Sequence, residues 1–435
     1  MFAVRVVRTA LRATPTPEDA VTLLHRRASR EGLAPPAALC GDWFSSRAVL
    51  APTVRIQTVS DVAKAFATVT RRPELTPTEP GVVGGGWFGY LSYDLTDPSG
   101  RRCALPRAAW GWADHVLRLD SEGRWWFEAL VPDDAPDPDA LAADLDALLS
   151  TRPGRDTAFT WRPTTLPLPS RDEHHSAVAA CVRAIAAGEL FQANICTRLS
   201  GDFHGEPAAL FTEGIRRLAP ARSAYLAGDW GALVSMSPEL FLSRSGRRVR
   251  SSPIKGTRPR RGPHDDHQAD ELRRSTKDVA ENVMITDLVR NDLGRVCEVG
   301  SVRVPELLAV RPAPGVWHLD STVEGVLADG RDDTDLLHAT FPPGSVTGAP
   351  KIRALDLVAE LESAPRGVYT GAIGLASPVV GMELNVAIRT FEISDGTVRL
   401  GVGGGITADS DPDAEWRECL HKAAPLTRLL EQPPN

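Results

Sequence analysis

Cysteine is scarce and unpaired in this 435-residue chain. Its six cysteines lie far apart and form no C-x-x-C motif, which argues against both a zinc site and a disulfide framework. Such cysteine usage fits a reducing compartment. The chain also has no apolar run long enough to span a bilayer, and its N-terminus has no signal-peptide core. We therefore expect a cytoplasmic protein that works away from membranes.

An excess of positive charge is missing as well. The chain has 49 Lys and Arg residues against 56 Asp and Glu residues, a formal net charge of −7. This balance gives no reason to expect nucleic acid or an anionic membrane as a partner. Hydrophobic residues make up 42% of the chain and charged residues 24%, as in ordinary globular proteins. The length is sufficient for one large or two ordinary domains.

The sequence patterns divide the chain near residue 165. Residues 1 to about 130 contain several strand-like segments. A short helix follows, with Asp137 as its expected cap, Pro138 at its first position and Leu149 near its end. A proline-rich connector covers residues 152–169. We expect residues 1–165 to form an N-terminal β-rich subdomain with a linker, and residues 166–435 to form a second domain.

Helical and strand patterns alternate irregularly in the second part. The expected helices cover residues 171–187, 269–292, 350–361 and 413–430. The expected strands cover residues 190–199, 224–228, 231–235, 240–244, 368–376, 382–393 and 397–401. Because strands and helices show no steady β-α-β alternation, the pattern predicts an α+β fold with large sheets.

Two pairs of acidic residues repeat a helical spacing. Asp278 and Glu281 are three residues apart on one expected helix, and Glu415 and Glu418 repeat that spacing on the last helix. If the two faces meet, four carboxylates cannot all stay ionised without a cation. A donor set of oxygens alone suits Mg²⁺. The alternative is a surface ion pair, since Lys277 lies four residues before Glu281.

The segment Pro253-Ile254-Lys255-Gly256-Thr257 places one lysine in an expected sharp turn. A lysine is a nucleophile only as the free amine, and burial or nearby cations lower its pKa toward that form. The alternative is an ordinary lysine that extends from a turn into solvent.

Several residues near the C-terminus could bind an anion. Gly403, Gly404 and Gly405 follow an expected strand, and glycines let backbone N–H groups approach a carboxylate closely. A structural bulge explains them equally well. Arg389 lies on the inner face of an expected strand, where it needs an acid or a substrate carboxylate as its partner. His318 is either a general base or a buried polar residue.

An ordered set of motifs in residues 171–429 resembles the chorismate-binding enzymes, which include anthranilate, aminodeoxychorismate, isochorismate and salicylate synthases. The segments that carry this resemblance are LFQAN (190–194), SPELF (237–241), PIKGT (253–257), ENVMITDLVRND (281–292), TGAPK (347–351), YTGAIG (369–374) and the glycine-rich loop followed by E-x-x-E-x-x-x-K. The resemblance implies an anthranilate synthase component I-like fold, with large antiparallel sheets in a sandwich flanked by helices.

Three positions separate the branches of this family. Lys255 resembles aminodeoxychorismate synthase component I, whereas anthranilate synthases usually have Ala there. Gln192 stands where the water-using isochorismate and salicylate synthases usually have a general-base Lys, which argues against hydration. Residues 40–44 stand where anthranilate synthases have an L-L-E-S element typical of tryptophan feedback, and they do not match it.

The resemblance implies a role for each matching residue. Lys255 adds to C2 of chorismate while Glu239, as general acid, protonates the departing C4 hydroxyl, and ammonia then replaces the lysine at C4. Mg²⁺ is expected at Glu281 and Glu418, with Asp278 and Glu415 in support. The expected substrate-binding residues are Gln192, Gly256, Thr257, Ser345, Tyr369, Arg389, Gly403, Gly404, Gly405 and Lys422.

The resemblance also implies a partner and leaves alternatives open. The sequence contains no Gly-x-Cys-x-Gly nucleophile motif, so a separate glutamine amidotransferase subunit is expected to supply ammonia. Anthranilate synthase component I and aminodeoxyisochorismate synthase are the alternative enzymes. A non-catalytic homologue is expected to have lost at least one of Lys255, Glu239, Glu281 and Glu418, and all four are present.

Overall fold

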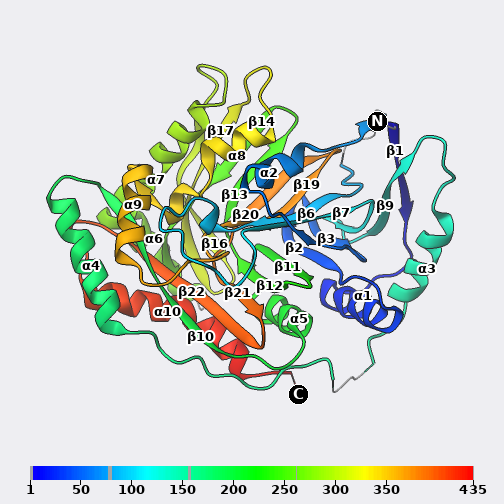
Figure 1. Ribbon diagram of the computed structural model, residues 1–435, viewed down its shortest axis with the longest axis horizontal. Coiled ribbons are helices and arrows are strands. Elements are labelled where there is room, and N and C mark those ends of the chain that lie inside the picture. Colours follow the sequence, from blue (N-terminus) through cyan, green and yellow to red (C-terminus); the bar gives the residue numbers. More distant parts are fainter. Residues whose placement is uncertain (1–2, 77–80, 155–157, 261, 435) are drawn as a thin grey trace.

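Two large β-sheets stacked face to face form the centre of the protein (Figure 1). The computed structural model describes residues 3–76, 81–154, 158–260 and 262–434. Every strand pair in these ranges is antiparallel except β1 (Ala3–Ala10) with β5 (Glu74–Leu75). Helices cover the outer faces of both sheets. The expected α+β class and the antiparallel sandwich flanked by helices are confirmed.

Within the described ranges, the larger sheet has twelve strands and the smaller sheet ten. In spatial order the larger sheet contains β18 (Gly348–Ala349), β10 (Gln192–Asp202), β22 (Thr397–Ile406), β21 (Thr390–Ser394), β12 (Gly231–Ser237), β11 (Arg222–Gly228), β2 (Ala37–Trp43), β3 (Ser46–Ala51), β8 (His115–Asp120), β9 (Trp125–Pro132), β1 and β5. The smaller sheet contains β15 (Ile254–Pro259), β17 (Val316–Val326), β14 (Arg248–Ser252), β13 (Leu240–Ser245), β20 (Gly381–Val386), β19 (Ala372–Ser377), β6 (Gly86–Leu91), β7 (Ala108–Ala113) and β4 (Gln57–Thr58), with β16 (Arg303–Ala313) paired to β17.

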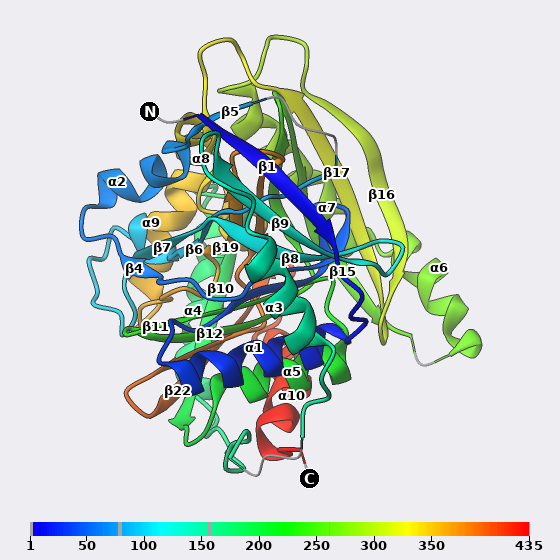
Figure 2. The same ribbon diagram turned by 90° about the vertical axis from the view of Figure 1, so that its right-hand side faces the viewer.

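The helices form two outer layers and one end of the molecule. On the larger sheet lie α1 (Pro17–Glu31), α3 (Asp139–Leu149), α5 (Pro207–Leu218) and α10 (Pro412–Glu431). On the smaller sheet lie α2 (Val62–Ala67), α7 (Thr276–Gly294) and α8 (Asp333–Thr340), while α4 (Arg171–Ala186) and α9 (Lys351–Leu361) pack over β10. Figure 2 shows α1, α5 and α10 side by side beneath the sheets. The remaining elements are α6 (Asp266–Arg274) and four short 3-10 turns, η1 (Thr68–Thr70), η2 (Tyr93–Leu95), η3 (Pro263–Asp265) and η4 (Gly344–Val346).

Side chains from both sheets interlock between them. The larger sheet contributes Leu39 and Leu233, and the smaller sheet contributes Phe88, Tyr90 and Ile373, all fully buried. Burial of side chains of this size stabilises the fold by roughly 1.5–3 kcal/mol each. The sheets are thus held as one body. No helix within the described ranges is long and apolar enough to traverse a lipid bilayer.

Both sheets contain strands from either side of residue 165. In the larger sheet, β2 pairs with β11 from Tyr225 opposite Ala38 to Arg222 opposite Gly41. In the smaller sheet, β6 pairs with β19. The first 165 residues therefore extend the sheets of the rest of the chain, and the division at residue 165 stays a prediction.

The structure corrects two long elements expected in the second part of the chain. The helix expected over residues 269–292 is two helices, because Ser275 adopts an extended conformation (φ −68°, ψ 105°) between α6 and α7. Its hydroxyl accepts a hydrogen bond from the backbone N–H of Asp278 and so caps α7. The strand expected over residues 382–393 is broken between β20 and β21, where Arg389 has a φ of +52°.

Three smaller corrections concern the ends of elements. Gly403–Gly405 do not follow a strand but lie inside β22, where they pair with β10. The strand expected to start at residue 368 starts at Ala372, so Tyr369 lies in a turn before it. Asp137 does not cap α3, which begins at Asp139 without a side-chain cap, and Asp137 instead accepts a hydrogen bond from Arg5.

Ser275 should contribute measurably to stability, since it satisfies an N–H at the start of α7 that the helix itself leaves unpaired. We expect Ser275→Ala to lower the free energy of unfolding by about 1 kcal/mol. Ser275→Asp should retain the cap and stay near the wild-type value. Urea unfolding midpoints at matched slope test this, and equal midpoints for Ser275→Ala and the wild type would contradict it.

Candidate active site

The residues expected to carry chemistry gather between α7 and α10, on β15 of the smaller sheet and on β10 and β22 of the larger sheet. Lys255 does not lie in a sharp turn but inside β15, which shifts its register on β17 between Ile254 and Thr257. This bulge contains Gly256 at φ +87°. A Cβ atom on Gly256 would lie 3.0 Å from Cβ of Asp278. Glycine is therefore required here by both conformation and space.

The amine of Lys255 is buried and bonded to Glu281. Its Nζ donates to Oε1 of Glu281 at 2.8 Å, and Nε2 of Gln192 donates to the same oxygen at 2.6 Å. Oε1 of Gln192 is buried and has no hydrogen-bond partner in the described structure. A Cβ atom on Gly405 would lie 2.2 Å from both Gln192 Nε2 and Glu281 Oε1. Because Gly405 has no side chain, it leaves space for the hydrogen bonds among Gln192, Glu281 and Lys255.

Each of the four predicted metal ligands has a cationic partner within the protein. The four pairs are Lys255–Glu281 at 2.8 Å, Arg258–Asp278 at 2.8 Å, Lys277–Glu415 at 3.1 Å and Lys422–Glu418 at 2.7 Å. These partners supply the positive charge that four clustered carboxylates need. Lys277 of α7 reaches Glu415 of α10, so the two helices approach each other here, and protein side chains compensate the charge of the carboxylates.

The carboxylates reach β22 from opposite faces. A Cβ atom on Gly404 would lie 3.1 Å from Glu415 and 3.7 Å from Glu418, whereas Gly405 faces Glu281. Successive residues of a strand face opposite sides, so Gly404 and Gly405 leave room for carboxylates on the two faces of β22. The described residues contain no group of three His, Cys, Asp or Glu side chains placed to hold a metal ion.

Two observations nevertheless fit a divalent cation between Glu281 and Glu418. Oε2 of Glu415 is buried without a hydrogen-bond partner. Burial alone would raise the pKa of the Glu418 carboxyl. The charges of Lys422, Lys277 and Lys255 lower this pKa by more than burial raises it, so the net shift is downward. Lys255 therefore places positive charge near both carboxylates. Asp278 accepts a hydrogen bond from Arg258, which occupies one of its carboxylate oxygens and argues against direct contact between Asp278 and a cation.

Glu239 is a buried carboxyl whose surroundings favour its neutral form. It follows Ser237, whose hydroxyl accepts a hydrogen bond from the Glu239 backbone N–H at 3.2 Å. Burial raises the pKa of Glu239 to about 7, although a hydrogen bond with Ser345 and the charge of Lys255 oppose the rise. A carboxyl with such a pKa can donate a proton near neutral pH.

The charge of Arg389 affects the pKa of His318, and the charge of Glu239 affects the pKa of Arg389. The guanidinium of Arg389 has neither a hydrogen bond nor an ion pair with another described side chain. Burial lowers the pKa of Arg389, against the charge of Glu239. Burial and the charge of Arg389 lower the pKa of His318 to about 4, so its ring is neutral and bonds Thr257 Oγ1 through Nδ1 at 3.1 Å. Arg389 is therefore free to bind an anion.

The glycines of β22 leave one edge of that strand open. The ladder with β21 ends at Leu400, so Gly403–Gly405 pair only with β10 among the described strands. Lys422 Nζ donates to the carbonyl oxygen of Gly403 at 2.9 Å. The ring of Tyr369 packs against Gly401, where a Cβ atom would lie 2.2 Å from it. Open backbone groups at such an edge can bind a carboxylate.

Sequence reasoning missed the true partner of Lys277. Its spacing suggested an ion pair with Glu281 on the same helix, yet it reaches across to Glu415 on α10. Ser410 was also missed, and its hydroxyl donates to Glu415 Oε1 at 2.7 Å. Neither contact has a local sequence signal, because both depend on how α7 and α10 pack.

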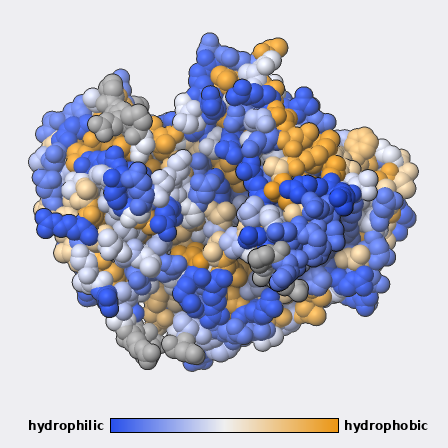
Figure 3. Space-filling model, turned by 180° about the vertical axis from the view of Figure 1, so that it is seen from behind, coloured by the Kyte–Doolittle hydropathy of each residue, from blue (hydrophilic) through white to orange (hydrophobic). Residues whose placement is uncertain are grey.

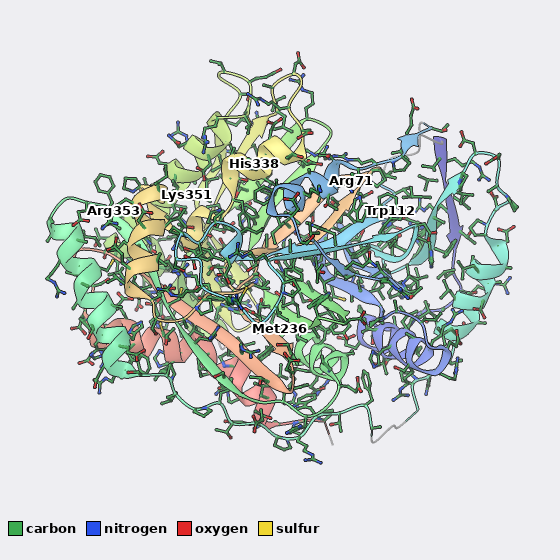
Figure 4. All side chains as sticks on the ribbon, in the orientation of Figure 1. Arg71, Trp112, Met236, His338, Lys351 and Arg353 are labelled. Atoms are coloured by element: carbon green, nitrogen blue, oxygen red, sulfur yellow. The ribbon has the colours of Figure 1, made fainter. Side chains whose placement is uncertain are left out.

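Lys351 of the TGAPK motif holds neighbouring helices together. Figure 4 shows Lys351 and Arg353 on α9. Nζ of Lys351 donates to Asp292 Oδ2 at 2.6 Å and to the carbonyl oxygens of Thr340 and Pro342 at 2.8 and 2.9 Å. All three donors of the ammonium are satisfied, so this lysine ties α9 to α7 and α8.

Proteins of known sequence resemble this chain over most of its length. Anthranilate synthase component 1 of Streptomyces coelicolor is 38% identical over 397 residues, covering 86% of this chain and 76% of that protein. Aminodeoxychorismate synthase of Streptomyces griseus is 40% identical over 382 residues, covering 83% and 52%. Aminodeoxychorismate synthase component 1 of Escherichia coli is 34% identical over 395 residues, covering 87% and 84%. The chain spans about half the length of the Streptomyces griseus protein.

A solved structure and a family match agree with these relatives. Anthranilate synthase component I from Streptococcus pneumoniae superposes with a TM-score of 0.72 at 25% sequence identity, covering 98% of this chain and 92% of that one. The family described as chorismate binding enzyme matches residues 37–428. The chain therefore belongs to the chorismate binding enzyme family, as its motifs indicated.

Proposed function

We propose that this chain is aminodeoxychorismate synthase component I, which converts chorismate and ammonia to 4-amino-4-deoxychorismate. The observation that carries the proposal is the buried Lys255 amine, 2.8 Å from Glu281 and within the influence of Glu239. Relatives named aminodeoxychorismate synthase and anthranilate synthase match this chain at similar identity, so the lysine of the PIKGT segment, rather than overall likeness, favours this product.

The side chains of the site suit a two-step displacement at the ring. Lys255 first loses its ammonium proton to solvent. As the free amine it adds at C2 with a shift of the ring double bond, while Glu239 gives its proton to the C4 hydroxyl, which leaves as water. Ammonia then adds at C4 and the lysine amine leaves from C2. One proton returns to Glu239, so the balance is chorismate plus ammonia to aminodeoxychorismate plus water.

Other residues would hold the substrate during both steps. Arg389 and the open edge of β22 at Gly403–Gly405 suit its carboxylates, and Gly256 and Thr257 would line the ring. His318 is neutral and hydrogen-bonded, which suits orientation of Thr257 better than proton uptake. Gln192 presents an unpartnered carbonyl oxygen in place of a base that could activate water.

Mg²⁺ is the expected cofactor, and Glu281 and Glu418 would hold it with Glu415 in support. When bound, it would orient the ring carboxylate of chorismate and neutralise its charge. The oxygen-only donors and the unpartnered Oε2 of Glu415 fit this ion. The partner is expected to be a glutamine amidotransferase that releases ammonia.

Product analysis tests the proposed function directly. With chorismate, Mg²⁺ and ammonium, mass spectrometry should detect 4-amino-4-deoxychorismate, and p-aminobenzoate should form only after an aminodeoxychorismate lyase is added. The enolpyruvyl group is retained because the enzyme carries out substitution alone. Fluorescent anthranilate formed without a lyase would overturn this assignment in favour of anthranilate synthase.

Lys255→Ala should reduce ammonium-dependent 4-amination on the order of 10³-fold or more, because the covalent step is lost. Lys255→Arg is the matched variant, since it keeps a positive charge beside Glu281 without a usable nucleophile. It should fold normally and be equally inactive. Wild-type turnover by either variant, measured from product formation, would refute the nucleophile role.

The raised pKa of Glu239 gives the reaction a characteristic pH dependence. A general acid must be protonated, so kcat/KM for amination should fall as the pH rises through about 7. Glu239→Gln should abolish this alkaline decline and lower the rate roughly 10²–10⁴-fold. Burial also raises the pKa of Glu392 to about 7, and Glu392→Gln should keep the decline. A decline that persists in Glu239→Gln would assign it to another group.

A further inference from the structure

Two buried carboxylates hold the turn that carries Tyr369. Charged side chains usually lie at the surface, and Figure 3 shows hydrophilic residues over much of one face of the molecule. Asp94 in η2 is only 2% exposed, however, and Glu392 in β21 only 4%. Neither forms an ion pair with another described residue. Burial without a cationic partner is costly for a carboxylate unless hydrogen bonds satisfy it.

These hydrogen bonds come from three successive backbone N–H groups of the turn at residues 367–370. The N–H of Gly367 donates to both carboxylate oxygens of Asp94, at 3.2 Å each. Oε1 of Glu392 accepts from the N–H groups of Val368 and Tyr369, at 3.0 Å each. A Cβ atom on Gly367 would lie 2.6 Å from Oε2 of Glu392, so only glycine lets the carboxylate come this close. The turn is therefore built around the two acids.

The same turn is bonded to the segment that carries Arg389. The N–H of Thr370 donates to the carbonyl oxygen of Ala387 at 2.8 Å, and the N–H of Ala387 donates to that of Gly371 at 2.9 Å. Thr370 and Arg389 have φ angles of +65° and +52°, which are strained for residues other than glycine. Such strain persists only where surrounding contacts enforce it, and it is common at functional sites. The bonds to the two carboxylates help to enforce it here.

The position of the turn decides where the side chain of Tyr369 lies. Its ring packs against Gly401 of β22, and its hydroxyl is hydrogen-bonded with the thiol of Cys196. A Cβ atom on Gly403 would lie 2.7 Å from Sγ of Cys196, so this thiol borders the glycines of β22. The tyrosine hydroxyl thus lies near the open strand edge that suits a substrate carboxylate.

We propose that Glu392 is a positioning residue for substrate binding, which holds the backbone of Tyr369 so that the tyrosine hydroxyl can orient a carboxylate of chorismate. The inference rests on the proposed function, in which this edge of β22 binds that carboxylate. Glu392 acts through the turn, because its carboxylate is buried and bonded to the backbone of Val368 and Tyr369.

Equilibrium binding of chorismate separates positioning from stabilisation alone. Glu392→Met is similar in size but leaves two buried N–H groups without an acceptor. Its Kd for chorismate with Mg²⁺ and without ammonium, measured by titration calorimetry, should rise about tenfold or more. Glu392→Gln keeps a carbonyl oxygen at the same reach and should stay within about twofold of the wild type. A role in stability alone would lower the number of binding sites and leave the Kd unchanged.

Glu128→Met is the matched control. Glu128 is fully buried, and its Oε2 also accepts two successive backbone N–H groups, those of Val83 and Gly84 at 2.7 and 3.1 Å. It lies in β9, toward the opposite end of the larger sheet from β22. Glu128→Met should lower the free energy of unfolding and bind chorismate with the wild-type Kd.

A double variant tests whether the effect passes through the tyrosine hydroxyl. Tyr369→Phe removes that hydroxyl and should itself raise the Kd about tenfold or more. Adding Glu392→Met to Tyr369→Phe should weaken binding by less than about twofold, because residues that act through one group are not additive. Two effects that multiply in full would overturn the positioning role.

A wild-type Kd in Glu392→Met would also overturn the proposal. If Glu392→Met does not fold, Glu392→Asp decides, because its carboxylate is one carbon shorter and should weaken chorismate binding as well. A wild-type Kd in that variant would count equally against the proposal. A product other than 4-amino-4-deoxychorismate from the wild type would instead overturn the proposed function, while the Kd values still decide the role of Glu392.

Discussion

The ion pair between Lys255 and Glu281 is the interaction on which the candidate site depends. A buried carboxylate without a partner would be strongly destabilising, and so would a buried ammonium. Glu281 accepts hydrogen bonds from both Lys255 and Gln192, so one oxygen fixes two side chains from different sheets. The same arrangement means that any cation bound at Glu281 must replace or rearrange an existing positive charge.

Burial gives neighbouring groups opposite protonation states. Glu239 and His318 are both pushed toward their neutral forms, the acid because its pKa rises to about 7 and the imidazole because its pKa falls to about 4. Arg389 stays charged, since its ordinary pKa lies far above neutrality. One region therefore offers a proton donor and an unpaired cation together, a combination that suits an anionic substrate with a poor leaving group.

Local pattern predicted much of this site, and packing decided the rest. The i, i+3 carboxylates of α7 and α10 were predictable, because helical spacing alone puts each pair on one face. The break at Ser275 was not, since the apolar periodicity continues through it. The glycines of β22 were expected to follow a strand that ends at residue 401, but pairing with β10 continues the strand through them. The contact of Lys277 with Glu415 depends on the docking of two helices far apart in sequence.

The interleaving of early and late strands has a consequence for how the chain is made. β2 and β6 find their neighbours β11 and β19 only after many more residues have been synthesised. Until then, both early strands carry unpaired hydrogen-bonding edges that could associate with other chains. Such distant pairing also slows folding, because a long loop must close before the contact forms. A nascent chain released early would thus be prone to aggregation, and its maturation would depend on protection of those edges on the ribosome.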